Sequence, residues 1–456
     1  MICHELGRYV RIFVFSGLFL AFAVPPGWAQ TAPLKLTLDE AIARGIRTNL
    51  AVLNRESSDK LVRAERTRTL SALYPTVNAG ASQNVQENNI AVFGFRFPGI
   101  PTIIGPFGYQ DLRASAEMDL YNRSSRLRVK AAGQNIRAAE LSTDDAKDLV
   151  VEAVANAYLT IVASAARVEA SRAEVATAQA LYERAHDQHA AGISPAIDEL
   201  RSQVQLKGRQ QQLLAAENQW SKSKLLLARV IGLPAEQDFE LADNAPYSPL
   251  TAMTPAQLLD RARQSRADYR ALQAQLESAK ITREAASAQR YPTLTAGGNY
   301  GFNGVNQAQL HQTFAFAGSV KVNVFDGGRI RSDVAQADAV IEQRKNEIAD
   351  LERRMDVDIR TALLDLQSAA DQVAVAESNL DLANQTLTQA RDRFTAGVTD
   401  NIEVVQAQDA LAGAQDNLIS SRYAHNLAKV ALARAVGMTE TNLKQFMFEQ
   451  GRGAAK

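Results

Sequence analysis

Cysteine is almost absent from this 456-residue sequence: Cys3 is the one example, and it lies in a segment that we expect to be removed. The mature chain would then hold no disulfide, no reactive thiol and no cysteine-based metal site. Neither sign of charge is in excess, because 50 Lys and Arg residues balance 50 Asp and Glu residues. This balance argues against a nucleic-acid partner and against an acidic disordered tail.

Features typical of globular enzymes are also scarce. Aromatic residues make up only 6% of the chain, which is low for a globular core but ordinary for long helices that pack through small side chains. The sequence has no nucleophile elbow, phosphate-binding glycine loop or zinc spacing. His186 and His189 stand one helical turn apart, but without a third candidate ligand two exposed histidines are a simpler interpretation than a metal site. We expect no enzyme, no cofactor and no metal.

Residues 1–29 have the pattern of a secretory signal peptide. Arg8 and Arg11 supply positive charge, residues 12–24 are apolar, and residues 27–29 form a small-x-Ala cleavage site. The alternative is a membrane anchor, but about 13 apolar residues are too few for a hydrocarbon core that needs about 20. We expect no later stretch to be apolar enough to span a membrane as a helix.

The remainder of the chain contains two copies of one unit. Thr37 opens a capping box, and Thr254 opens the same device with proline at the first helical position. Each predicts a helix that ends at a Tyr-Pro-Thr phrase, beginning at Tyr74 and Tyr291; both pairs are 217 positions apart. Such a long-range repeat is the strongest architectural signal in the sequence.

The offset between the copies then changes. Ala-Gly-Ile-Ser at 191–194 and Ala-Gly-Val-Thr at 396–399 are 205 positions apart, so the first copy holds an insertion of 12 residues. The Pro- and Gly-rich segment 93–108 is the candidate, and it predicts a loop. We therefore divide the chain into a first repeat at 30–250, a second at 251–440 and a C-terminal tail at 441–456.

Each copy holds a predicted β-hairpin, at 76–121 and 293–325, in which apolar and polar residues alternate. One apolar face and one charged or amide face suit a strand between lipid and a water-filled lumen, although a soluble sheet with one wet face gives the same pattern. Four strands cannot close a barrel, and an open edge in lipid leaves backbone groups unpaired, so the chain must oligomerise if the strands enter a membrane. The apolar positions include Val77, Ala79, Leu112, Ala114, Leu294, Tyr300, Phe314, Phe316, Val322 and Val324, and an aromatic girdle would include Tyr74, Tyr109, Tyr121, Tyr291, Tyr300 and Phe325.

A long helix follows each hairpin. Segments 124–191 and 329–396 contain one glycine and no proline, and about 68 residues at 1.5 Å each predict helices of roughly 100 Å. Apolar residues repeat every seven positions, with alanine often three residues later, which indicates coiled-coil packing. With the return helices after each turn, we expect antiparallel helical hairpins at 124–231 and 329–436. The repeating positions in the second copy are Ile359, Leu366, Val373, Leu380, Leu387 and Phe394, with Ala362, Ala369, Ala376, Ala383 and Ala390.

The duplicated order of helix, Tyr-Pro-Thr, β-hairpin, long helix, Ala-Gly-Val turn and return helix resembles the TolC-like outer-membrane efflux proteins over residues 34–440. The resemblance implies a mixed fold, in which each chain gives four strands to a trimeric transmembrane β-barrel and long coiled-coil hairpins to a periplasmic α-barrel. It implies a homotrimer in the outer membrane of a Gram-negative bacterium, in contact with outer-membrane lipid. It further implies a passive exit duct for drugs, metals or proteins, which docks on a periplasmic adaptor and an inner-membrane transporter of an efflux or type I secretion system.

The resemblance also implies which residues carry function. The family's two acids that ring the closed pore match Glu403 and Gln406, and the second position departs from the family's acid. Asp198 takes the corresponding place in the first copy. Three converging Glu403 carboxylates would repel one another or bind a cation, whereas the alternative is a solvated acid at a helix start. The adaptor-docking tips would be Gly192, Ile193 and Ser194 in the first copy and Gly397, Val398 and Thr399 in the second.

One other class of protein stays open from the sequence. A periplasmic coiled-coil adaptor or scaffold would fit the heptads but not the four alternating strands. Membrane fractionation distinguishes the two, because a scaffold would stay soluble.

Overall fold

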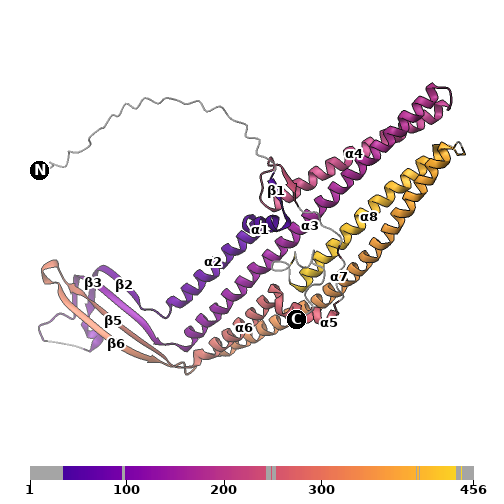
Figure 1. The fold of residues 1–456 in the computed structure, drawn as a ribbon. Coiled ribbons are helices and arrows are strands. Elements are labelled where there is room, and N and C mark those ends of the chain that lie inside the picture. The colour runs from indigo at the N-terminus through magenta and orange to yellow at the C-terminus, as the bar shows by residue number, and fades with distance from the viewer. Residues whose placement is uncertain are drawn as a thin grey trace, which may run out of the picture.

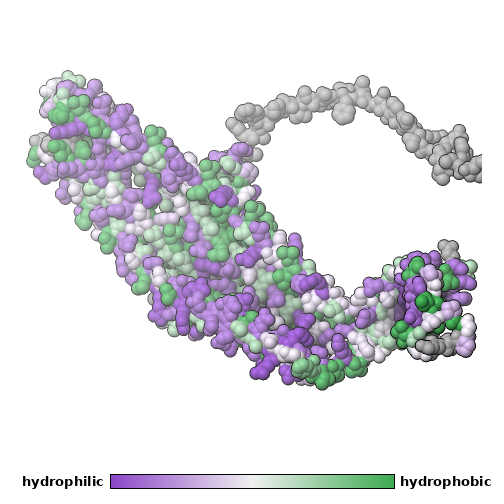
Figure 2. Space-filling model, turned by 180° about the vertical axis from the view of Figure 1, so that it is seen from behind, coloured by the Kyte–Doolittle hydropathy of each residue, from purple (hydrophilic) through white to green (hydrophobic). Residues whose placement is uncertain are grey.

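The computed structural model describes residues 34–94, 98–242, 248, 253–396, 398–399, 401–437 and 443. The predicted signal peptide lies outside this part of the chain, as does the predicted tail apart from Leu443. The molecule is elongated, with a β-sheet at one end, long helices through the middle and two helical hairpin tips at the other end (Figure 1). Figure 2 shows the molecule from behind, where hydrophobic patches are visible both at the sheet end and at the tip end.

The two sequence copies form similar series of elements. The first contains β1 (Leu34–Leu36), α1 (Leu38–Thr48), α2 (Leu50–Ser71), β2 (Thr76–Asn89), η1 (Ile90–Phe93), β3 (Ile103–Tyr121), α3 (Arg123–Ala190), α4 (Ala196–Val230) and β4 (Phe239–Leu241). The second contains α5 (Pro255–Ser265), α6 (Ala267–Ser287), η2 (Ala288–Arg290), β5 (Thr293–Gly304), η3 (Gln307–Gln309), β6 (His311–Lys321), α7 (Arg329–Thr395) and α8 (Asn401–Val436). Strands β1 and β4 pair in parallel beside the middle of the helices.

The other four strands form one antiparallel sheet in the order β2-β3-β5-β6. The register places apolar residues opposite apolar residues: Ala79 pairs with Ala114, Ala114 with Tyr300, and Tyr300 with Phe314. Ser115 and its partner Asn299 belong to the opposite face. Because directly paired residues share a face, the predicted apolar and polar sides are both present.

Two details of the predicted hairpins are wrong. Strand β6 ends at Lys321, so Val322 and Val324 lie beyond it and are exposed. The segment 93–108, expected as a loop, instead enters strand β3 at Ile103, because that part of the insertion pairs with the end of β2.

The helix predicted to open each copy is interrupted once. Thr37 caps α1 as expected, but the chain turns extended at Asn49 and again at Arg266 in the second copy. At each break the side chain donates a hydrogen bond to a carbonyl in the last turn of the return helix, from Asn49 Nδ2 to Val230 O at 3.2 Å and from Arg266 Nη1 to Ala435 O at 3.4 Å. These bonds join residues that are far apart in the chain, which is why the sequence pattern alone did not reveal the interruption.

Each return helix ends in a glycine that packs against the interruption. Gly232 and Gly437 have φ of 66° and 76°, in the left-handed region that favours glycine. A Cβ on Gly437 would lie 2.8 Å from the Cα of Arg266, and one on Gly232 would lie 2.6 Å from the Thr48 hydroxyl oxygen. The same joint therefore occurs in both copies.

The long helices confirm the heptad prediction. Helices α3 and α7 contain 68 and 67 residues, and α7 packs along α8 as α3 packs along α4. Ile359, Leu366, Val373 and Leu387 are buried, as are all five of the alanines three positions later. The close approach of small residues gives a thin wall of helices.

One apolar stretch of α3 corrects an expectation. An 18-residue window of this helix is long and apolar enough to cross a membrane, so the expectation that no segment after the leader would qualify is wrong. Half of that window is buried inside the protein. Val151, Val154 and Tyr158 of α3 belong to the core cluster formed with residues of α1, α4 and α8, and a buried core helix accounts for the composition.

Candidate channel wall, constriction and docking tips

The polar face of the sheet carries both signs of charge. Arg113 donates from Nε to Asp111 at 3.2 Å and from Nη1 to the Asn299 side-chain oxygen at 2.9 Å. On the other face Phe314 and Phe316 are 67% and 80% exposed. A strand between lipid and water requires exposed apolar side chains on one face and hydrogen-bonded polar side chains on the other.

Helices α2, α3, α6 and α7 continue this two-sided arrangement as a curved wall. Neighbouring pairs are in contact in that order, and a hollow of about 850 Å³ touches all four helices. Its lining mixes small residues with charged and amide side chains, including Asp59, Arg128, Gln275 and Arg344. The hollow therefore combines small apolar side chains with charges of both signs.

Glu403 lies in the first turn of α8 but does not present a bare charge. Arg393, in the last turn of α7, donates from Nη1 to Glu403 Oε1 at 2.8 Å, and the Thr399 hydroxyl donates to the other carboxylate oxygen. Gln406 follows one turn later and is exposed. Sequence reasoning missed Arg393 because it is the tight turn between the helices that brings these residues together.

The first tip has a complete turn geometry. Gly192 has a φ of 73°, and the N–H groups of Ile193 and Ser194 donate to Gln188 O at 2.8 and 3.3 Å. Asp198, in the first turn of α4, lies 3.6 Å from Arg201. Each tip therefore has an acid paired with an arginine, but the arginine comes from α4 itself in the first copy and from α7 in the second.

Apolar side chains project from both tips. Ile193 is 76% exposed and Val398 is 68% exposed. Thr399 is engaged with Glu403, whereas Gly397 lies outside the described residues.

The two tip histidines share a carboxylate. Glu199 Oε1 lies 2.8 Å from His186 Nδ1, and Glu199 Oε2 lies 3.9 Å from His189 Nε2. The hydrogen bond to Glu199 raises the pKa of His186. Within the described ranges no group of three or more His, Cys, Asp or Glu residues is arranged to hold a metal.

A buried arginine joins the two helical hairpins above the tips. The Arg209 side chain, 10% exposed, lies on α4 and contacts Glu174 on α3 at 3.1 Å and Asp409 on α8. Burial raises the pKa of Glu174. A second link runs from Arg167 of α3 to Asp416 of α8 at 2.7 Å. Neither link to α8 has a short-range sequence signal, since Arg209 and Asp409 are 200 residues apart and Arg167 and Asp416 are 249 apart.

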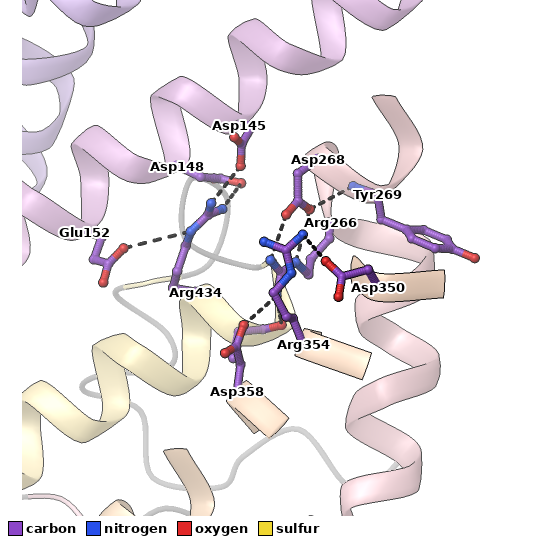
Figure 3. Close-up of polar contacts among 11 residues, drawn as sticks. Asp145, Asp148, Glu152, Arg266, Asp268, Tyr269, Asp350, Arg354, Asp358 and Arg434 are labelled. Carbon is purple, nitrogen blue, oxygen red and sulfur yellow. Dashed lines mark hydrogen bonds and ion pairs between the residues drawn. The ribbon is translucent and has the colours of Figure 1, made fainter. Parts of the chain in front are cut away.

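A second charge cluster joins the repeats at the middle of the molecule (Figure 3). Arg434 of α8 faces three carboxylates of α3: Asp145 at 2.7 Å, Asp148 at 3.8 Å and Glu152 at 3.8 Å. Burial raises the pKa of Glu152 despite the nearby guanidinium.

Beside this cluster Arg266 bonds to Asp268 at 2.7 Å and lies 3.5 Å from Asp358 (Figure 3). Burial opposes ionisation of Asp268, but the hydrogen bonds and charge of Arg266, with the Tyr269 N–H and the charge of Arg434, together outweigh it and lower the pKa of Asp268. The two arginines therefore neutralise acids from several helices at one level of the wall.

Comparison with known proteins agrees with this architecture. The family model described as outer membrane efflux protein matches residues 46–233 and 258–438. The pyoverdine export outer membrane protein OpmQ of Pseudomonas aeruginosa is 25% identical over 72% of this chain and 69% of its own length. Outer membrane protein TolC of Vibrio cholerae is 23% identical over 81% of this chain and 84% of its own length.

The solved structure of the outer membrane protein VceC of Vibrio cholerae has the same fold, with a TM-score of 0.74 at 20% identity over 88% of this chain and 96% of that one. The predicted resemblance and mixed channel fold are confirmed, and the scaffold alternative is excluded. The chain belongs to the outer membrane efflux protein family, whose members are channels of the Gram-negative outer membrane that extend into the periplasm.

Proposed function

We propose that three copies of this chain form one exit duct through the outer membrane and the periplasm. The observation that carries the proposal is the open sheet: β2 and β6 each have one paired neighbour, so two edges are left for other strands. Three copies joined edge to edge would give a closed twelve-stranded barrel and leave no unpaired edge in lipid. The curved wall of α2, α3, α6 and α7 would close in the same way into a tunnel.

The duct works as a passive conduit in this proposal, fed by an inner-membrane transporter through a periplasmic adaptor. A lining that mixes small apolar residues with charges of both signs favours passage of varied solutes over tight binding of one. The relative OpmQ is named for pyoverdine export, which supports a small organic cargo for this chain over a secreted protein. Nothing in this mechanism requires catalysis.

We place the periplasmic constriction at Glu403 and Gln406, with Asp198 on the neighbouring hairpin. Three-fold symmetry would bring three of each together. Because Arg393 pairs with Glu403 at 2.8 Å, the ring would alternate in sign and select weakly for cations. This revises the expectation of three uncompensated carboxylates.

The exposed apolar residues Ile193 and Val398 are the proposed contacts for the adaptor, together with Gly192, Ser194, Gly397 and Thr399. A hydrophobic side chain at the end of a rigid hairpin is a good anchor for a partner, because little entropy is lost when it docks.

The oligomeric state tests the central proposal. The protein extracted from outer membranes in detergent should have the mass of three chains by light scattering, after correction for bound detergent. A monodisperse monomer in the same detergent would refute the duct, because one open sheet cannot line a pore.

A further inference from the structure

The β2–β3 hairpin extends past the rest of the sheet. Pairing between β2 and β3 continues to Asn89 and Ile103, whereas β3 pairs with β5 only as far as Gln110 and Gly304. The seven residues from Ile103 to Tyr109 therefore project beyond the four-stranded part, by roughly 24 Å at about 3.4 Å per residue. This end of the sheet is opposite the helices, so the projection lies on the extracellular side.

The inward face changes its chemistry where the projection begins. Asp111 and Arg113 are on the polar face of β3, and Phe107 and Tyr109 follow them at the same two-residue spacing. Phe107 pairs with Gln86 and Tyr109 with Asn84, which places both aromatic residues on the lumen side of the hairpin. No Phe, Tyr or Trp occupies that face among the described positions of the four-stranded part.

The register also overturns the expectation that Tyr109 belongs to a lipid-facing aromatic girdle. Val85, paired with Gly108, is on the lipid side of the same hairpin and is 72% exposed. Lipid cannot cover the opposite side of a barrel strand. Ile103 and Ile104, at 53% and 40% exposed, extend the apolar character to the end of the projection.

We infer that the three projecting hairpins lean inward and meet through Phe107 and Tyr109, forming an apolar collar at the outer mouth of the duct. The inference rests on the proposed trimer, and the occupant of each apolar face is the same hairpin of the two other copies. Twelve strands about 4.8 Å apart and tilted by about 40° enclose a radius of roughly 12 Å. Phe107 lies three residues past Gln110, roughly 10 Å along the strand, so an inward bend at the rim brings its side chain close to the axis, with Tyr109 around it.

Packing also favours this arrangement. From Gln110 to Tyr121 strand β3 is held in the sheet by β2 on one side and β5 on the other, whereas its projecting residues have only β2. A two-stranded ribbon can bend inward at the rim without breaking the barrel. Burying two aromatic side chains per copy removes apolar surface from water, which favours the inward arrangement.

Cysteine cross-linking tests the convergence, since Cys3 in the predicted leader is the only native cysteine. Phe107→Cys should give covalent dimers on mild oxidation in outer membranes, whereas the lipid-side control Val85→Cys should not. A detergent-extracted trimer without Phe107→Cys dimers would overturn the collar and leave the duct intact. A monomer would overturn both.

Access from outside the cell tests the constriction itself. Ser115→Cys places a thiol on the lumen face below the collar, and a small maleimide should label it in otherwise native protein. A maleimide carrying a large polyethylene glycol should label it slowly, and the double change Phe107→Ala and Tyr109→Ala should remove that protection. Val85→Ala is the matched control and should leave it in place; equal labelling in all three backgrounds would refute the collar.

Discussion

Replacing Arg434 should expose how much the central charge cluster holds the two repeats together. The Arg434 side chain is 16% exposed, and its three acidic partners, Asp145, Asp148 and Glu152, are 9–30% exposed. Removing one member of a buried ion pair costs about 3–5 kcal/mol, because the remaining charge stays desolvated. Since water still reaches part of this cluster, we expect about 3 kcal/mol for Arg434→Met, at the lower end of that range.

The pH dependence of this penalty is the more specific test. Burial raises the pKa of Glu152 and the Arg434 charge lowers it, so removing the guanidinium leaves this carboxylate with a folded-state pKa above that in the unfolded chain. The folded variant then binds more protons than the unfolded one, so its stability rises as pH falls. The difference from the native protein should therefore be smaller at pH 5 than at pH 8.

Thermal unfolding by circular dichroism in detergent, at one scan rate, measures this effect. In a chain of this length 1 kcal/mol corresponds to roughly 1–2 °C, so Arg434→Met should lower Tm by about 3–6 °C at pH 8. The control is Arg422→Met on the same helix, whose pair with Glu377 is about half exposed on both sides and should matter little. Equal Tm losses in the two variants, or a loss that does not shrink at pH 5, would refute the reasoning.

Three further changes test other parts of the structure. Gly437 has a φ of 76°, and a Cβ there would lie 2.8 Å from backbone, so Gly437→Ala should lower the free energy of unfolding by at least about 2 kcal/mol. Gly413→Ala is the control, because no described atom lies within 4 Å of its Cβ, and it should raise the free energy of unfolding by about 0.5–1 kcal/mol in the same assay. Phe316→Arg on the lipid face should cost about 2–4 kcal/mol and impair barrel assembly, while Ala315→Arg on the lumen face should assemble normally on a native gel. Arg393→Ala should free the carboxylate that it neutralises and increase cation selectivity in planar bilayers; unchanged reversal potentials would place the constriction elsewhere.

The parts of the fold that follow from the sequence are those with a short period. The alternation of apolar and polar residues predicted the faces of the strands, and the seven-residue repeat of apolar residues predicted buried residues of α7. Both signals are local, because each residue's environment depends on neighbours at a fixed spacing. The end of β6 at Lys321 was missed because Val322 and Val324 continue the alternation after pairing with β5 has ended.

The parts that were missed depend on contacts between distant residues. Nothing near Glu403 in a one-dimensional pattern distinguishes a free carboxylate from one paired across a turn with Arg393. The Arg209–Asp409 link and the Arg434 cluster likewise join α4 or α3 to α8. From the sequence pattern, charged residues on a long helix are expected to face solvent. Only the packing of one helical hairpin on the other shows which of them are buried.

The duplication explains why the two halves share geometry but differ in chemistry. At the joint of the first copy an amide, Asn49, bonds to the return helix; at the second a guanidinium, Arg266, takes the same place. The extended backbone at the break and the glycine that ends the return helix are common to both copies, so the joint itself does not depend on charge. Arg266, however, brings a buried positive charge that needs acidic partners, and Asp268 and Asp358 supply them. The ion pairs of Arg266 therefore belong to the second copy, and substitutions of Arg266 should respond to pH where the matching substitutions of Asn49 do not.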